Sequence, residues 1–124
     1  MSVINNLPTG GGGKAVQVWT GSVTTGNISV DLSRYKYVAV VSKSSTGSDA
    51  KPRGVALVPV GGSGYIGCNY TGGQNVYQTS KRLTVTTTTV TVSGTNNGTY
   101  NSNNVIIAIY GIKSDLDMAS AWTQ

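Results

Sequence analysis

The side chains most often used in catalysis are scarce in this sequence. It has no histidine and no glutamate, and its single cysteine is Cys68. The absence of histidine excludes Ser–His and Cys–His nucleophilic systems and imidazole metal sites. One cysteine forms neither a disulfide within the chain nor a cysteine-rich metal site. We expect Cys68 to be a buried thiol that packs as a small hydrophobic group.

Four aspartates, Asp31, Asp49, Asp115 and Asp117, are the only acidic side chains. Hydrolysis by paired carboxylates requires two of them to converge. Two lie in the N-terminal half and two near the end of the sequence, so convergence is not expected. Asp115 and Asp117 also lack the ligand-rich loop that calcium requires. We therefore predict that the protein is not an enzyme and that it binds no metal and no cofactor.

Two glycine-rich runs, Gly10–Gly13 and Gly61–Gly64, resemble phosphate-binding loops only superficially. Neither contains the GxxxxGK[ST] pattern, and neither leads from a strand into a helix, which is the context in which such a loop binds phosphate. We interpret both runs as turns or connectors.

Tyrosine is the dominant aromatic residue, with seven Tyr, two Trp and no Phe. Tyr65, Tyr70 and Tyr77 lie close together in the sequence, among Gly, Asn, Gln and Ser. A tyrosine offers a flat apolar ring and a hydroxyl, which suits both sugar rings and protein interfaces. Two interpretations stay open: half-buried strand residues with solvated hydroxyls, or a surface that contacts a glycan or another partner.

The charge pattern favours assembly over nucleic-acid recognition. Nine Lys and Arg against four Asp give a net charge of +5, but charged residues are only 10% of the chain. The basic residues are scattered, and no nucleic-acid-binding motif accompanies them, so specific nucleic-acid binding is not expected. A basic balance still indicates contact with an anionic surface. Uncharged polar surfaces suit crowded assemblies, because burying a hydroxyl costs less than burying a charge.

Alternating apolar residues and closely spaced turn signals predict an all-β domain. We expect an antiparallel β-sandwich or jelly-roll-like fold of about eight strands. The expected strands are Val16–Trp19, Ile28–Leu32, Tyr35–Ser42, Gly54–Val60, Tyr65–Tyr70, Asn75–Thr79, Arg82–Ser93 and Val105–Ile112.

Three strands carry more specific predictions. In Arg82–Ser93 the alternation slips by one residue within Thr86–Thr89, which predicts a β-bulge. Pro59 indicates a sheet edge or a strand end. The segment Val105–Ile112 is apolar on both faces and is predicted to be a central strand and the least replaceable element. Ile107→Ala is expected to destabilise the fold by roughly 2–5 kcal/mol if Ile107 is fully buried.

The chain divides into an N-terminal arm over residues 1–13, a β-sandwich domain over 14–113 and a short C-terminal tail over 114–124. Within the domain, Ser44–Arg53 is expected to be an exposed loop. In the arm, Val3, Ile4 and Leu7 form a small apolar anchor for assembly. In the tail, a single-turn helix and an extended segment are both possible, and Trp122 needs a cover in either case.

The sequence starts without a basic, apolar signal peptide, and no apolar run approaches the ~20 residues of a membrane span. We therefore expect synthesis in a cytoplasm, no export by a standard route and no membrane span.

Three segments resemble small virion surface proteins of tailed bacteriophages, namely tail-fibre, head-fibre and decoration modules: Asn5–Gly10, Val18–Ser42 and Ile106–Lys113. The resemblance implies a β-sandwich or jelly roll, often a homotrimer, that is attached to capsid or tail proteins by its N-terminal arm. It implies location in the virion after synthesis in the cytoplasm of the host bacterium. Fibre proteins usually carry a long shaft, and this chain is too short for one, which favours a decoration, spike or adaptor role.

An alternative function belongs to a different class. The protein would then be a carbohydrate-binding module that contacts host-surface glycans through Tyr65, Tyr70 and Tyr77.

Overall fold

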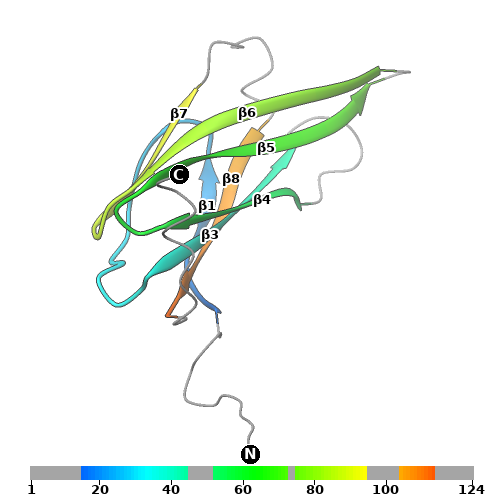
Figure 1. The fold of residues 1–124 in the computed structure, drawn as a ribbon. Coiled ribbons are helices and arrows are strands. Elements are labelled where there is room, and N and C mark those ends of the chain that lie inside the picture. Colours follow the sequence, from blue (N-terminus) through cyan, green and yellow to red (C-terminus); the bar gives the residue numbers. More distant parts are fainter. Residues whose placement is uncertain (1–14, 45–51, 73–74, 95–103, 114–124) are drawn as a thin grey trace, which may run out of the picture.

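The computed structural model describes residues 15–44, 52–72, 75–94 and 104–113. Over these ranges the chain forms eight strands and no helix (Figure 1). The strands are β1 (Ala15–Val23), β2 (Gly26–Ser29), β3 (Tyr37–Ser44), β4 (Pro52–Pro59), β5 (Ser63–Gly72), β6 (Asn75–Val85), β7 (Thr89–Gly94) and β8 (Asn104–Ile112). The predicted arm and the predicted tail lie outside the described residues.

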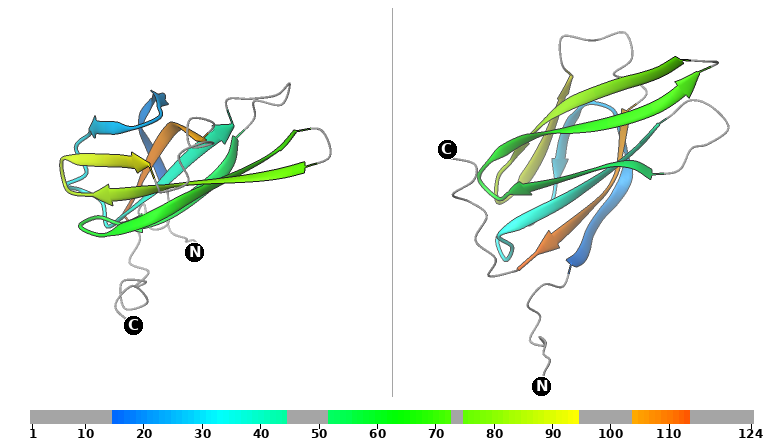
Figure 2. Two further views of the ribbon diagram at one scale, coloured as in Figure 1. Left: turned by 90° about the horizontal axis from the view of Figure 1, so that it is seen from above. Right: turned by 45° about the vertical axis from the view of Figure 1, so that its right-hand side comes forward.

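The strands form two antiparallel sheets that pack against each other, which confirms the predicted β-sandwich (Figures 1 and 2). Sheet A has the order β1-β8-β3-β4, and sheet B has the order β2-β7-β6-β5. β8 lies between β1 and β3, as predicted for a central strand. Pro59 is the last residue of β4, which is an edge strand. Because no further strand pairs with that edge, the missing N–H of proline removes no hydrogen bond between strands.

The core lies between the two sheets because alternate residues of each strand point toward the opposite sheet. On β3, for example, Val38 and Val40 are fully buried, whereas Ala39 and Val41 on the other face are half-buried. The buried cluster consists of Ile28, Leu32, Val38, Val40, Val58, Ile66, Leu83, Val85, Val90, Val92, Ile106 and Ile109. Cys68 is also buried, as predicted.

The predicted single strand over residues 82–93 is wrong. The chain turns after Val85, and β6 and β7 form a hairpin in which Val85 lies opposite Val90. The Thr86 hydroxyl accepts hydrogen bonds from the backbone N–H groups of Thr88 (3.2 Å) and Thr89 (3.0 Å). The hydroxyl thereby satisfies turn amides that would otherwise need water, a role typical of threonine. The slip in alternation therefore marks a reversal of direction and not a bulge.

The condition attached to the Ile107 prediction is not met. Ile107 is half-buried, whereas Ile106 and Ile109 are fully buried. The register between β3 and β8 shifts at this point, with Val41 opposite Ala108 and Ser42 opposite Ile106. Ile107 is thus the extra residue of a bulge, and the core contacts belong to its neighbours.

The predicted strand Asn75–Thr79 is the first part of β6, which continues without a break to Val85. Other strand bounds differ modestly from the prediction. β2 ends at Ser29, but the chain stays close to sheet B, since Val30 N donates to Thr88 O (3.0 Å) and Leu32 N to Thr87 O (2.8 Å). The predicted loop is shorter at both ends, because Ser44 is the last residue of β3 and Pro52 the first of β4.

Candidate interaction surfaces

The four residues predicted as assembly contacts, Val3, Ile4, Leu7 and Trp122, lie outside the described residues. Of the predicted partner contacts, Tyr65 lies on β5 and is 65% exposed. Tyr70 on β5 is directly opposite Tyr77 on β6.

The register separates Tyr65 from the other two tyrosines. Cys68 and Thr79 are a cross-strand pair whose side chains are both buried, so they mark the core-facing positions of β5 and β6. Positions 70 and 77 are each two residues from this pair and have the same alternation. Tyr65 has the opposite alternation and belongs to the outer face of sheet B. Positions 70 and 77 therefore do not share the alternation of Tyr65.

The outer face of sheet A is apolar, and its composition follows from the register. Three cross-strand rows run from β4 through β3 and β8 to β1. They are Val55-Val41-Ala108-Thr20, Leu57-Ala39-Tyr110-Gln17 and Pro59-Tyr37-Ile112-Ala15. None of these residues is charged. Val55 is 69% exposed and Ala39, Val41 and Leu57 are half-buried, whereas Tyr37 and Ala108 are buried. We call these rows the outer apolar face.

The outer face of sheet B has the opposite character. Its central row, from β5 to β2, is Ser63-Thr84-Thr91-Asn27, and the Thr91 hydroxyl donates to Asn27 Oδ1 at 2.8 Å. Hydroxyl and amide groups of this kind are well solvated, which is usual for the solvent-facing side of an antiparallel sheet. The contrast between the two outer faces indicates that sheet A, and not sheet B, is suited to an apolar contact.

One end of the core is polar. Asn104, which is fully buried, bridges the sheets by donating from Nδ2 to the carbonyl of Ile66 (3.1 Å), and Thr79 Oγ1 donates to the Cys68 carbonyl (3.1 Å). Ser42 Oγ and Asn104 Oδ1 are buried without a hydrogen-bond partner among the described residues. Such groups cost free energy unless water or another group reaches them.

The sheets also approach each other closely at this polar end. A Cβ placed on Gly54 of β4 would lie 2.0 Å from the carbonyl oxygen of Gly67 on β5. Only glycine fits at position 54. The close contact leaves no room for a ligand between Gly54 and Gly67.

Lys81 is a fully buried cation in the same half of the sandwich. Its ammonium donates a hydrogen bond to the carbonyl oxygen of Thr24, at the turn between β1 and β2. Burial lowers the pKa of Lys81, because the charged form loses its hydration. The sequence offered a signal for this residue, since Lys81 occupies a core-facing position between Thr79 and Leu83 on an alternating strand.

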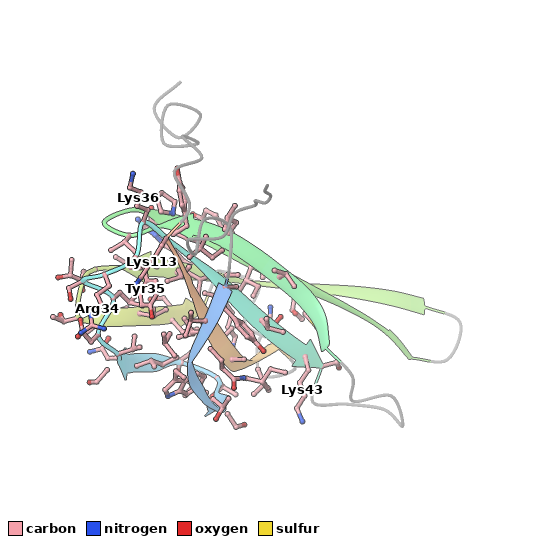
Figure 3. All side chains as sticks on the ribbon, turned by 90° about the horizontal axis from the view of Figure 1, so that it is seen from below. Arg34, Tyr35, Lys36, Lys43 and Lys113 are labelled. Carbon is pink, nitrogen blue, oxygen red and sulfur yellow. The ribbon has the colours of Figure 1, made fainter. Side chains whose placement is uncertain are left out.

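Basic residues gather at the other end of the sandwich, around Tyr35 (Figure 3). Lys36 N donates to the carbonyl of Ile112 (2.9 Å), and Lys113 Nζ lies 5.9 Å from the centroid of the Tyr35 ring. Arg34, Lys36 and Lys113 are exposed there, whereas Lys43 lies elsewhere on the molecule.

Asp31 accompanies this basic end. Its Oδ1 accepts hydrogen bonds from Ser33 Oγ (2.7 Å) and Ser33 N (3.0 Å). The Ser33 bonds, with a smaller effect from the charge of Arg34, hold the pKa of Asp31 below its ordinary value. Because Ser33 satisfies this carboxylate locally, we interpret Asp31 as a turn residue.

The described ranges contain no group of three or more His, Cys, Asp or Glu side chains that could hold a metal ion. Asp49, Asp115 and Asp117 lie outside these ranges. No described helix is long and apolar enough to cross a membrane.

Sequence analysis missed the outer apolar face, although a signal was present. The runs 38–41 and 55–60 are apolar at both odd and even positions, as is 105–112.

Comparison of the chain with protein-family models, with curated proteins and with solved structures found no match.

Proposed function

We propose that this protein is a non-enzymatic structural protein that self-associates through the outer apolar face of sheet A and is displayed on a bacteriophage virion. The observation that carries the proposal is the contrast between the outer apolar face, whose three rows carry no charged residue, and the outer face of sheet B, which is rich in hydroxyl groups. Burial of apolar surface contributes a favourable free energy of roughly 25 cal/mol for each Å² removed from water, which favours a contact on the side of sheet A.

The virion assignment rests on the resemblance of three segments to phage surface proteins. Two of them, Val18–Ser42 and Ile106–Lys113, contain all but the last two residues of β3 and all but the first two residues of β8, which together form the middle of sheet A. A capsid decoration, spike or tail-fibre-type module, most simply a homotrimer, fits a domain of this size. In this proposal the N-terminal arm, with Val3, Ile4 and Leu7, anchors the domain to capsid or tail proteins, and Trp122 adds a further contact.

The test of self-association is light scattering over a range of protein concentrations. Val55 is exposed, so Val55→Asp leaves the core intact but places a charge on the outer apolar face, and we expect it to shift the mass toward the monomer. Thr84→Asp, on the exposed outer face of sheet B, is the matched control and should leave the mass unchanged. A wild-type protein that is monomeric at every concentration would contradict the proposal.

A second candidate function is binding of a host-surface glycan, favoured by one observation, the 65% exposure of Tyr65. A stacking contact of this kind contributes about 0.5–1.5 kcal/mol, so Tyr65→Ala should weaken glycan binding several-fold without unfolding the domain. Because the register divides Tyr65 from Tyr70 and Tyr77, substitution at position 65 and at positions 70 and 77 should have separable effects. Glycan-array binding of the wild type and these variants checks this alternative.

A further inference from the structure

Edge strands present unpaired backbone groups, and proteins usually protect them with bulges, prolines, charges or short length. Three of the four edges of this sandwich are protected in this way. β1 has two register shifts against β8, β4 begins with Pro52 and ends with Pro59, and β2 is only four residues long.

The fourth edge belongs to β5 and lacks these protections. β5 and β6 form ten consecutive pairs, from Ser63 opposite Thr84 to Gly72 opposite Asn75, without a register shift. Residues 63–80 include no proline and no charged residue. A long, regular and uncharged edge is a template for pairing with another strand.

The far half of this hairpin extends beyond the sandwich. β7 pairs with β6 only from Lys81 to Val85, so before Lys81 the one described strand that pairs with β6 is β5. Cys68 and Thr79, which directly precede this half of the hairpin, are a buried pair. Figures 1 and 2 show the ends of β5 and β6 reaching past all other strands. We call residues 69–72 and 75–78 the ribbon.

An isolated two-stranded ribbon is at best marginally stable in water, because each strand is paired on one side only. Among the described strands, β5 is the edge of sheet B, and β5 is the one strand that pairs with β6 along the ribbon. A ribbon of this kind gains stability from a strand that another molecule supplies.

We propose that the ribbon pairs edge to edge with the ribbon of a second copy of this chain. The inference rests on the self-association in the proposed function and identifies a second contact for it. β5 and β6 run in opposite directions, so the β6 edge of one copy meets the β5 edge of the next as an antiparallel pair when the ribbons point the same way. Contacts of this head-to-tail type satisfy both edges of every ribbon only in a closed ring, such as the trimer.

The area of the outer apolar face shows why self-association of this chain needs a second contact. Four strands spaced about 4.8 Å apart, over roughly five residues of about 3.4 Å each, give an outer apolar face on the order of 300 Å². Stable interfaces bury about 800 Å² per partner, so this face is too small to hold copies together by itself. The ribbon adds backbone hydrogen bonds between copies, and its lack of charge avoids repulsion between chains that are basic overall.

The experiment compares two double variants of the full chain that change the net charge equally. Thr71→Lys with Val76→Lys places charges on facing positions of the ribbon. Thr84→Lys with Ser93→Lys places them on exposed positions of the outer face of sheet B and is the control. We expect the ribbon variant to raise the dissociation constant for self-association at least about tenfold by light scattering, and the control to match the wild type.

Amide hydrogen exchange of the wild type supplies a readout that needs no variant. Exchange at residues 69–78 should be slow at high concentration and should accelerate on dilution, whereas core amides of β3 and β8 should stay protected throughout.

The outcomes separate this inference from the proposed function. An oligomer that Val55→Asp dissociates, but that survives the ribbon charges with concentration-independent exchange at 69–78, would overturn the ribbon contact alone. A wild-type monomer at all concentrations would overturn both.

Discussion

Val40 of β3 lies directly opposite Ile109 of β8, and both side chains are fully buried between the sheets. β8 is the second strand of sheet A, so Ile109 has neighbours on both sides as well as across the core. We expect Ile109→Ala to lower the free energy of unfolding by about 2–5 kcal/mol, because it leaves a cavity in a closely packed region. Ile107→Ala, at the half-buried bulge position, should cost less. Urea denaturation of both variants checks the order, and equal losses would contradict the assigned bulge.

The turn between β6 and β7 depends on the Thr86 hydroxyl. Thr86→Ala removes the acceptor for two backbone amides and should destabilise the protein by about 0.5–1.5 kcal/mol, since water replaces the lost bonds only in part. Thr87→Ala is a suitable control, because Thr87 uses its backbone carbonyl and not its side chain to bind Leu32. Thermal unfolding followed by circular dichroism measures the difference, and equal melting temperatures would argue against this role for Thr86.

Because of Lys81, we expect the free energy of unfolding to vary with pH in the alkaline range. Its pKa in the folded protein is below the ordinary value of 10.5, so between these two values the unfolded chain binds more protons than the folded protein. The free energy of unfolding should therefore rise with pH through that window.

The matched variant is Lys81→Met, which keeps the length of the side chain but has no charge to desolvate. It should abolish the Lys81 contribution to the alkaline rise and stabilise the protein at neutral pH by an amount on the order of 1 kcal/mol. Urea titrations at several pH values test both effects, and an unchanged pH profile in the variant would refute the assignment to Lys81.

Gly54 is required where the two sheets meet. A methyl group at this position would overlap the carbonyl oxygen of Gly67, so Gly54→Ala should force the sheets apart and cost at least about 1–3 kcal/mol. At Gly67 the nearest atom to an added Cβ is the Thr79 carbonyl oxygen at 3.7 Å, an ordinary contact. Gly67→Ala should therefore be tolerated much better. Chemical denaturation of the two variants is the measurement, and similar losses would contradict this packing.

Local patterns in the sequence were sufficient for the fold class and for most strands. Alternating residues such as Val38 and Val40 identify a core-facing side, because side chains of a strand alternate with a period of two. The apolar run at residues 105–112 was sufficient to predict β8 as a central strand, and β8 does lie between β1 and β3, although sheet B covers only one of its faces. The low content of charged residues was sufficient to suggest assembly, but it did not indicate which surface would make the contact.

Tertiary structure decided which surfaces those strands present. Whether Val55 and Val41 face the core or solvent depends on the register with β8, which joins residues far apart in the chain, such as Gln17 and Tyr110, 93 positions apart. The turn at Thr86 was mistaken for a bulge because a slip of one residue in the alternation fits both. Only the pairing of Val85 with Val90 distinguishes them. The projecting ribbon was likewise invisible, because a strand looks the same in sequence whether or not a neighbour lies beside it, and backbone pairing is made by groups that every residue shares.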